Sequence, residues 1–131
     1  MKKYLSKCFL LFLCIFSINS EPNIVKSNEV STGLYKYSSD IFIEYVMLED
    51  IDEAIIYSYR EQNDMDDRNS AIETSAILEN ALTEFCRLNL SKISRYKIYH
   101  SYKILKRRLH YNVKVNSNTY VIFESRVVFS Q

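Results

Sequence analysis

The hydrophobic positions of this chain recur at two different spacings. Residues 40–48, DIFIEYVML, are rich in branched and aromatic side chains over a strand-like length, which predicts a strand, with an early helical turn as the alternative. In residues 49–62 the apolar positions recur every three or four residues behind an acidic start, which predicts a helix. The polar and acidic residues 63–69 then predict a loop.

A second helix is predicted from Ser70 onward. Ser70–Glu73 reads Ser-Ala-Ile-Glu, the pattern of a capping box, in which the serine hydroxyl accepts from an early backbone amide and the glutamate reaches back. The apolar stripe that follows consists of Ile77, Leu78, Ala81, Leu82, Phe85 and Leu88. Such a stripe needs a flat apolar surface to cover.

Three strands are predicted after this helix, because apolar and polar residues alternate there with a period of two. The marker residues are Ile98, Tyr102 and Ile104, then Leu109, Tyr111, Val113 and Val115, then Val121, Phe123, Val127 and Phe129. The basic run Lys106–Arg108 is predicted to lie in a loop between the first two strands. The predicted fold class is therefore α+β, with one or two amphipathic helices packed on an antiparallel β-meander.

Residues 1–20 predict a secretory signal. Lys2, Lys3 and Lys7 precede the apolar run Cys8–Phe16, and small or polar residues follow it up to Ser20. The apolar run is about half of the roughly 20 residues that cross a bilayer, which favours a signal over a retained membrane anchor. The predicted localisation is secreted, either extracellular or, in a bacterium, periplasmic.

The rest of the chain divides into an arm and one domain. Residues 21–39 are polar, hold the only proline and the only glycine of the chain, and show no sustained period, which predicts a flexible N-terminal arm. Residues 40–131 are long enough for a single α+β domain.

Cysteine usage limits how the domain is stabilised. Cys8 and Cys14 lie in the predicted signal, so the mature chain would hold Cys86 alone and no intramolecular disulfide. Cys86 is interpreted either as a small buried hydrophobe or as a thiol for intermolecular pairing.

Charge is distributed unevenly along the mature chain. Loss of the signal would leave 14 basic against 16 acidic residues. Thirteen acidic residues lie between residues 40 and 84, whereas residues 85–123 hold nine basic residues and no acidic one. Two interpretations stay open: solvated faces on separate elements, or a basic half that meets an anionic partner.

The residue inventory argues against an enzyme. A single glycine excludes a glycine-rich phosphate loop, and His100, His110 and Cys86 make no spaced zinc set. Asp64 and Asp66 lack the glycine and the closing glutamate of a calcium loop. Because no acid, base and nucleophile can be grouped, we predict no catalytic residues, no metal and no cofactor.

Basic and aromatic residues alternate in 95–111, RYKIYHSYKILKRRLHY, as they do in sites for polyanions. Because the protein is predicted to be secreted, a glycosaminoglycan or an anionic lipid is a better candidate ligand than nucleic acid. We do not expect a nucleic-acid partner. Asn89-Leu90-Ser91 is a glycosylation sequon if the source is eukaryotic.

The order of elements resembles the cystatin family: a signal, an arm with a glycine, a helix, then antiparallel hairpins. In Leu105–Val115, LKRRLHYNVKV, Tyr111 and Val115 stand where that family has tyrosine and valine after its first inhibitory loop. Ile51–Asn63 is also similar to the family's helix.

The resemblance implies a wedge that blocks the cleft of a papain-like protease. Its residues would be Gly33 together with the loop residues Ile104, Leu105, Lys106, Arg107 and Arg108. This loop lacks the Gln and the Gly of the family's Gln-x-Val-x-Gly motif, so the resemblance implies either an inhibitor or a derivative that has lost inhibition. The alternative hypothesis is a binding module that recognises a polyanion or an anionic partner protein through a basic β-hairpin.

Overall fold

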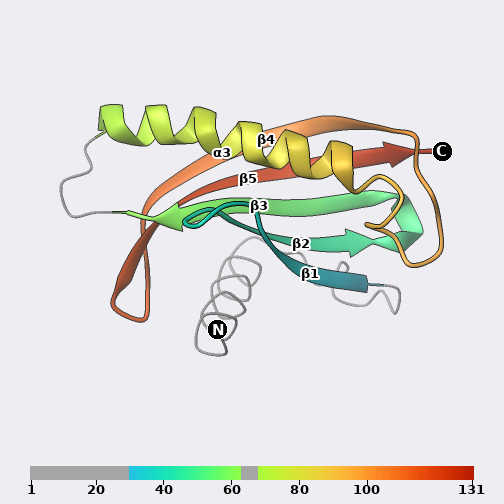
Figure 1. Ribbon diagram of the computed structural model, residues 1–131, viewed down its shortest axis with the longest axis horizontal. Helices are drawn as coiled ribbons and strands as arrows, with labels where there is room; N and C mark the ends of the chain where they lie inside the picture. The colour runs from blue at the N-terminus through green and yellow to red at the C-terminus, as the bar shows by residue number, and fades with distance from the viewer. Residues whose placement is uncertain (1–29, 63–67) are drawn as a thin grey trace.

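The structure, a computed structural model that describes residues 30–62 and 68–131, contains one antiparallel sheet and one long helix (Figure 1). The strands are β1 (Val30–Lys36), β2 (Phe42–Leu48), β3 (Glu53–Glu61), β4 (Ser101–Val115) and β5 (Asn118–Ser130). The helix is α3 (Arg68–Leu88), and a short 3-10 turn, η1 (Glu49–Ile51), joins β2 to β3.

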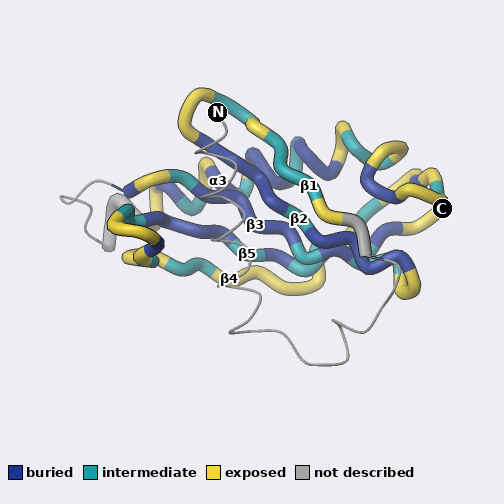
Figure 2. The backbone as a smooth tube through the Cα atoms, turned by 90° about the horizontal axis from the view of Figure 1, so that it is seen from below, coloured by how far each residue is buried: buried dark blue, intermediate teal, exposed yellow. Residues whose placement is uncertain are grey.

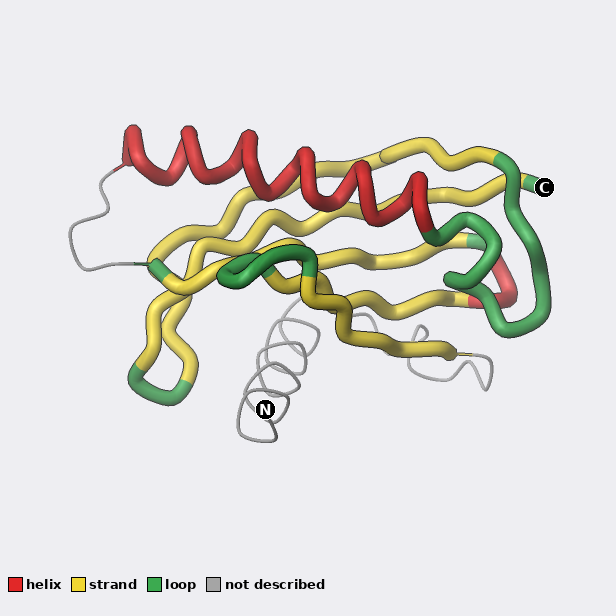
Figure 3. The backbone as a smooth tube through the Cα atoms, in the orientation of Figure 1, coloured by secondary structure: helices red, strands yellow, loops and turns green. Residues whose placement is uncertain are grey.

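The five strands lie in the order β1-β2-β3-β5-β4, and every neighbouring pair is antiparallel. Because β3 and β4 are each antiparallel to β5, they run in the same direction on its two sides. Helix α3 and the segment after it make the crossover between them (Figure 3). The order leaves β1 and β4 as the two edges of the sheet.

Helix α3 covers one face of the sheet, as Figure 1 shows. Leu78, Leu82 and Phe85 are almost fully buried in one cluster with Ile56 and Phe123 of the sheet. The Phe85 ring also packs against Tyr35 of β1 and Tyr45 of β2, with ring centroids 5.3 and 5.4 Å apart. This apolar layer is the larger of the two cores and fixes the helix on the sheet.

The second face of the sheet, which points away from α3, carries its own cluster. Its members include Phe42, Val46, Tyr57, Tyr59 and Ile122, all of them buried. Strands β2, β3 and β5 are therefore buried on both faces, while β4 is exposed over much of its length (Figure 2).

The α+β class is confirmed, as are the strand at 40–48 and the helix predicted from Ser70 onward. Four of the six predicted stripe residues of that helix, Leu78, Ala81, Leu82 and Phe85, are buried. Ile77 and Leu88 are instead 44% and 49% exposed. The apolar stripe of α3 that is buried is therefore narrower than the stripe that the sequence predicts.

The predicted helix at 49–62 is wrong: this segment forms η1 and then strand β3. Both faces of β3 are covered, with Ala54 and Ile56 toward α3 and Tyr57 and Tyr59 on the second face. A strand buried on both sides shows no clean alternation, and its apolar spacing can imitate a helix.

Two predicted boundaries also need correction. Part of the predicted flexible arm, Val30–Lys36, is strand β1, so the sheet begins ten residues before the predicted domain boundary at residue 40. Helix α3 begins at Arg68, so Ser70 lies in its first turn and not at the N-cap. The predicted signal (1–20), the rest of the arm (21–29) and most of the acidic loop (63–67) lie outside the described residues.

The predicted loop at Lys106–Arg108 is wrong as well. Two of the three predicted C-terminal strands are one strand, β4, which runs through the basic residues without a break. The tight turn comes later, at Asn116 and Ser117, which both have positive φ. The order of elements also differs from the layout that suggested the resemblance, because three strands precede the helix.

In the part of the chain that the structure describes, no helix is both long and apolar enough to span a membrane.

A candidate binding surface on the edge strand β4

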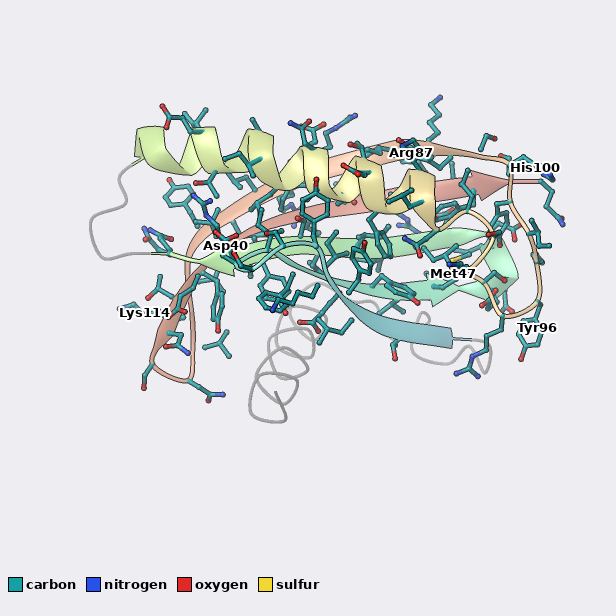
Figure 4. All side chains as sticks on the ribbon, viewed as in Figure 1. Asp40, Met47, Arg87, Tyr96, His100 and Lys114 are labelled. Atoms are coloured by element: carbon teal, nitrogen blue, oxygen red, sulfur yellow. The ribbon has the colours of Figure 1, made fainter. Side chains whose placement is uncertain are left out.

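Strand β4 lies at an edge of the sheet and carries most of the exposed basic side chains of the C-terminal half. We call Lys103, Lys106, Arg107, Arg108 and Lys114 the basic edge; all five are exposed. Lys114 lies near the tip of the β4–β5 hairpin, at the opposite end of the sheet from Tyr96 and His100 (Figure 4). Positive charge thus extends along almost the whole strand.

A β-bulge brings three of these side chains to one face. Ile104 pairs with Val127 and Lys106 with the next β5 residue, Arg126, so Leu105 is an extra residue in β4. The extra residue reverses the alternation beyond it. As a result Lys103, Lys106 and Arg108 all point to the second face, and Leu105 is left at the bulge, 51% exposed.

The basic edge is only partly neutralised within the protein. Arg107 points to the helix face, where its Nε donates to Oε2 of Glu79 at 2.9 Å. Among the described residues, Lys103, Lys106 and Lys114 form no salt bridge. Exposed ammonium groups without a carboxylate partner are available to an anion in solution.

A second bulge ends the regular part of the edge. The register shifts between His110 and Val113, and Asn112 adopts a positive φ of 57°. The side chain of Gln62 makes two hydrogen bonds to this bulge. Its Nε2 donates to the side-chain Oδ1 of Asn112 at 2.7 Å, and its Oε1 accepts from the backbone N–H of Asn112 at 3.0 Å. The neighbouring Tyr111 is 48% exposed.

The structure separates the residues that the resemblance to cystatins would bring together. Gly33 lies in β1 and Ile104 to Arg108 lie in β4, at opposite edges of the sheet. Strands are spaced about 4.8 Å apart, so these edges are roughly 19 Å from one another. Of the five β4 residues, Ile104 is packed against the core under the helix, whereas the other four are exposed.

Gly33 has a structural role that its sequence context did not indicate. It pairs with Tyr45 across the β1–β2 ladder, and the Tyr45 ring lies over it. A Cβ atom at position 33 would lie only 2.5 Å from Cε1 of Tyr45, so no larger residue fits without movement of the ring. Glycine here makes room for the aromatic side chain that reaches Phe85.

Buried carboxyl and phenol groups lie on the second face, and sequence reasoning missed them. Glu44 is 5% exposed, and the Tyr59 hydroxyl, itself buried, donates to its Oε2 at 2.5 Å. Burial raises the pKa of Glu44 to about 8, against the opposing effect of the hydrogen bond from Tyr59. The signal was present in the sequence: Glu44 interrupts an otherwise apolar strand.

This cluster continues along the sheet toward the basic edge. Tyr57 pairs with Glu44 on one side and with Glu124 on the other. Burial, reinforced by the charges of both carboxylates, raises the pKa of the Tyr57 phenol. Oε1 of Glu124 lies 2.7 Å from Nε2 of His110 and accepts a hydrogen bond from it in the tautomer that carries the proton on Nε2. Because Glu44, Tyr57 and Tyr59 are all nearly inaccessible to solvent, we assign the cluster a structural role.

A further polar network anchors the segment between α3 and β4. Lys97 Nζ and the Tyr99 hydroxyl each donate to Oδ1 of Asp52 at 2.7 Å. These two hydrogen bonds, from Lys97 and then Tyr99, lower the pKa of Asp52. Ser94 donates to the buried carboxylate of Glu49 at 2.5 Å. Lys97 is thus used internally, unlike the lysines of the basic edge.

Cys86, a residue of α3, is fully buried in the apolar layer between the helix and the sheet, which agrees with its interpretation as a small core residue. Burial raises the pKa of its thiol to about 12. Within residues 30–62 and 68–131, no three His, Cys, Asp or Glu side chains come together as a metal site would require.

Comparison of the chain with protein-family models, with curated proteins and with solved structures finds no match. A function for this protein must therefore be argued from its own geometry and charge.

Proposed function

We propose that this protein is an exported, non-enzymatic binding protein that recognises an anionic partner through the basic edge of β4. The observation that carries the proposal is the pair Lys103 and Lys106, two exposed lysines on one face of an edge strand without a carboxylate partner among the described residues. Export is inferred from the basic residues and the apolar run at the start of the chain.

The charge pattern supports an anionic partner over a neutral one. The basic edge belongs to a stretch of 39 residues, 85–123, without a single acidic residue. Clustered charge of one sign raises the local concentration of oppositely charged partners and speeds their association. It also discourages the edges of two copies from pairing, since like charges would then lie side by side.

Retention on immobilised heparin at increasing salt tests this proposal. We expect the wild-type protein to be retained and a Lys103→Glu/Lys106→Glu variant to elute at clearly lower salt, because charge attraction is screened by ions. The matched control is Lys36→Glu, which reverses an exposed lysine on β1, the opposite edge. Identical elution of all three proteins would overturn the proposal.

Inhibition of a papain-like protease, which the resemblance to cystatins implies, is the competing proposal. The distance between Gly33 and Ile104–Arg108 favours anion binding, because a wedge built from both would have to reach across the sheet. Titration of a papain-like protease at low and high salt separates the two. We expect no stoichiometric inhibition; tight inhibition that barely responds to salt would favour the inhibitor.

A further inference from the structure

We propose that the partner is an extended acidic peptide segment that adds to the edge of β4 as an additional strand along Leu105–Tyr111. This inference rests on the proposed function and specifies the partner and its mode of binding. It draws on three observations: the open edge between two bulges, the order of charged and apolar side chains along it, and the exposed apolar residue at each end.

The open edge has a defined length. Between the two bulges, Lys106–His110 pairs without interruption with β5 residues 126 to 122. Among the described residues no strand lies on the other side of β4, since β4 is the last strand of the sheet. The outer backbone N–H and C=O groups of an edge strand form a template for another strand. Five residues span about 17 Å, enough for a short peptide.

The side chains along this edge specify what the peptide should carry. A residue directly opposite another on an adjacent strand lies on the same face, about 5 Å away, where opposite charges attract. Lys106 points to the second face and forms no salt bridge with a described residue, so an acidic residue is favoured opposite it. Arg108 points to the same face and already lies opposite Glu124 of β5. On the helix face Arg107 is already bonded to Glu79, and Leu109 is partly buried, so apolar residues are favoured there.

The two ends of the edge add apolar contacts. Leu105 at the first bulge and Tyr111 at the second are each about half exposed. Together the features fit a peptide that alternates acidic and branched apolar residues. A second copy of this chain fits poorly, because its own edge would place basic residues opposite basic ones. A sulfated polysaccharide offers charge but lacks the amide ladder that an open edge can pair with.

Fluorescence anisotropy with a labelled peptide of alternating Asp and Val, about eight residues long, tests this mode of binding. The comparison peptide has the same sequence with every amide N-methylated, so it keeps the charge but cannot pair as a strand. The proteins are wild type, Lys106→Glu and the Lys36→Glu control, all at one salt concentration.

We expect the unmethylated peptide to bind wild type at least about tenfold more tightly than the N-methylated peptide does. We also expect Lys106→Glu to weaken binding of the unmethylated peptide about tenfold and Lys36→Glu to leave it unchanged. Strand addition would be overturned if wild type bound both peptides equally tightly, or if it bound neither. The proposed function would still stand if heparin retention depended on Lys103 and Lys106. Loss of heparin retention as well would overturn both.

Discussion

Replacing Glu44 by glutamine should stabilise the folded protein at alkaline pH and leave it almost unchanged at acidic pH. Glu44 lies on the second sheet face, 5% exposed, and its carboxyl group has a pKa of about 8 in the folded protein against 4.5 as the ordinary value. The folded state therefore binds this proton more tightly than the unfolded state. Between those two pKa values, stability must fall as the pH rises.

The size of the effect follows from the difference in pKa. Each pKa unit corresponds to about 1.36 kcal/mol, so a shift from 4.5 to about 8 costs on the order of 4 to 5 kcal/mol once the carboxylate is fully ionised. Glutamine does not titrate, and its side-chain oxygen can still accept the hydrogen bond from Tyr59. Near pH 5, where Glu44 is protonated in the folded state, the two proteins should differ by no more than about 1 kcal/mol.

Equilibrium unfolding in urea, measured at several pH values between about 5 and 9, checks this reasoning. The free energy of unfolding of wild type should decline relative to that of Glu44→Gln across this range. The matched control is Glu61→Gln, an exposed residue at the end of β3, which should follow the wild-type profile. A difference between Glu44→Gln and wild type that stays constant with pH would refute a protonated, buried Glu44.

Three other predictions concern the remaining features of the fold. Gly33→Ala should lower the free energy of unfolding by about 1–2 kcal/mol through its clash with the Tyr45 ring, and a double-mutant cycle should show that this cost disappears in a Tyr45→Ala background. Gln62→Ala should destabilise the protein by about 1–3 kcal/mol in urea unfolding, because Asn112 loses both of its hydrogen bonds to Gln62 at the bulge; an unchanged midpoint would contradict this role. In a Cys8→Ser/Cys14→Ser protein, the Cys86 thiol should react with an aromatic disulfide reagent only as fast as the protein unfolds, since it is buried and its pKa is about 12; immediate reaction of this folded protein would exclude that burial.

Local pattern in the sequence was enough to predict helix α3 and two of the strands. The stripe through Leu78, Leu82 and Phe85 repeats at helical spacing because one side of α3 meets the sheet. Strands β2 and β5 were likewise predictable from their branched and aromatic residues. The excess of basic residues after Phe85 was also visible, and it led to the candidate site.

Local pattern failed for β3, because its apolar spacing imitates that of a helix. Glu53–Glu61 forms a strand because β2 and β5 pair with its two edges, and apolar side chains cover both of its faces. Periodicity cannot distinguish such a strand from a helix. Glu44 was overlooked for a related reason: its burial depends on the sheet around it, and so does its pKa.

The sequence by itself determined the fold class, the main helix and the positive charge of the segment that contains Lys106, Arg107 and Arg108. Only the tertiary structure decided that this segment is an edge strand instead of a loop, and that the bulge at Leu105 turns Lys106 to the same face as Lys103. The physical reason is that strand order and register are set by hydrogen bonds to β5, whose residues come later in the chain. No local pattern of hydrophobic and polar residues contains that pairing.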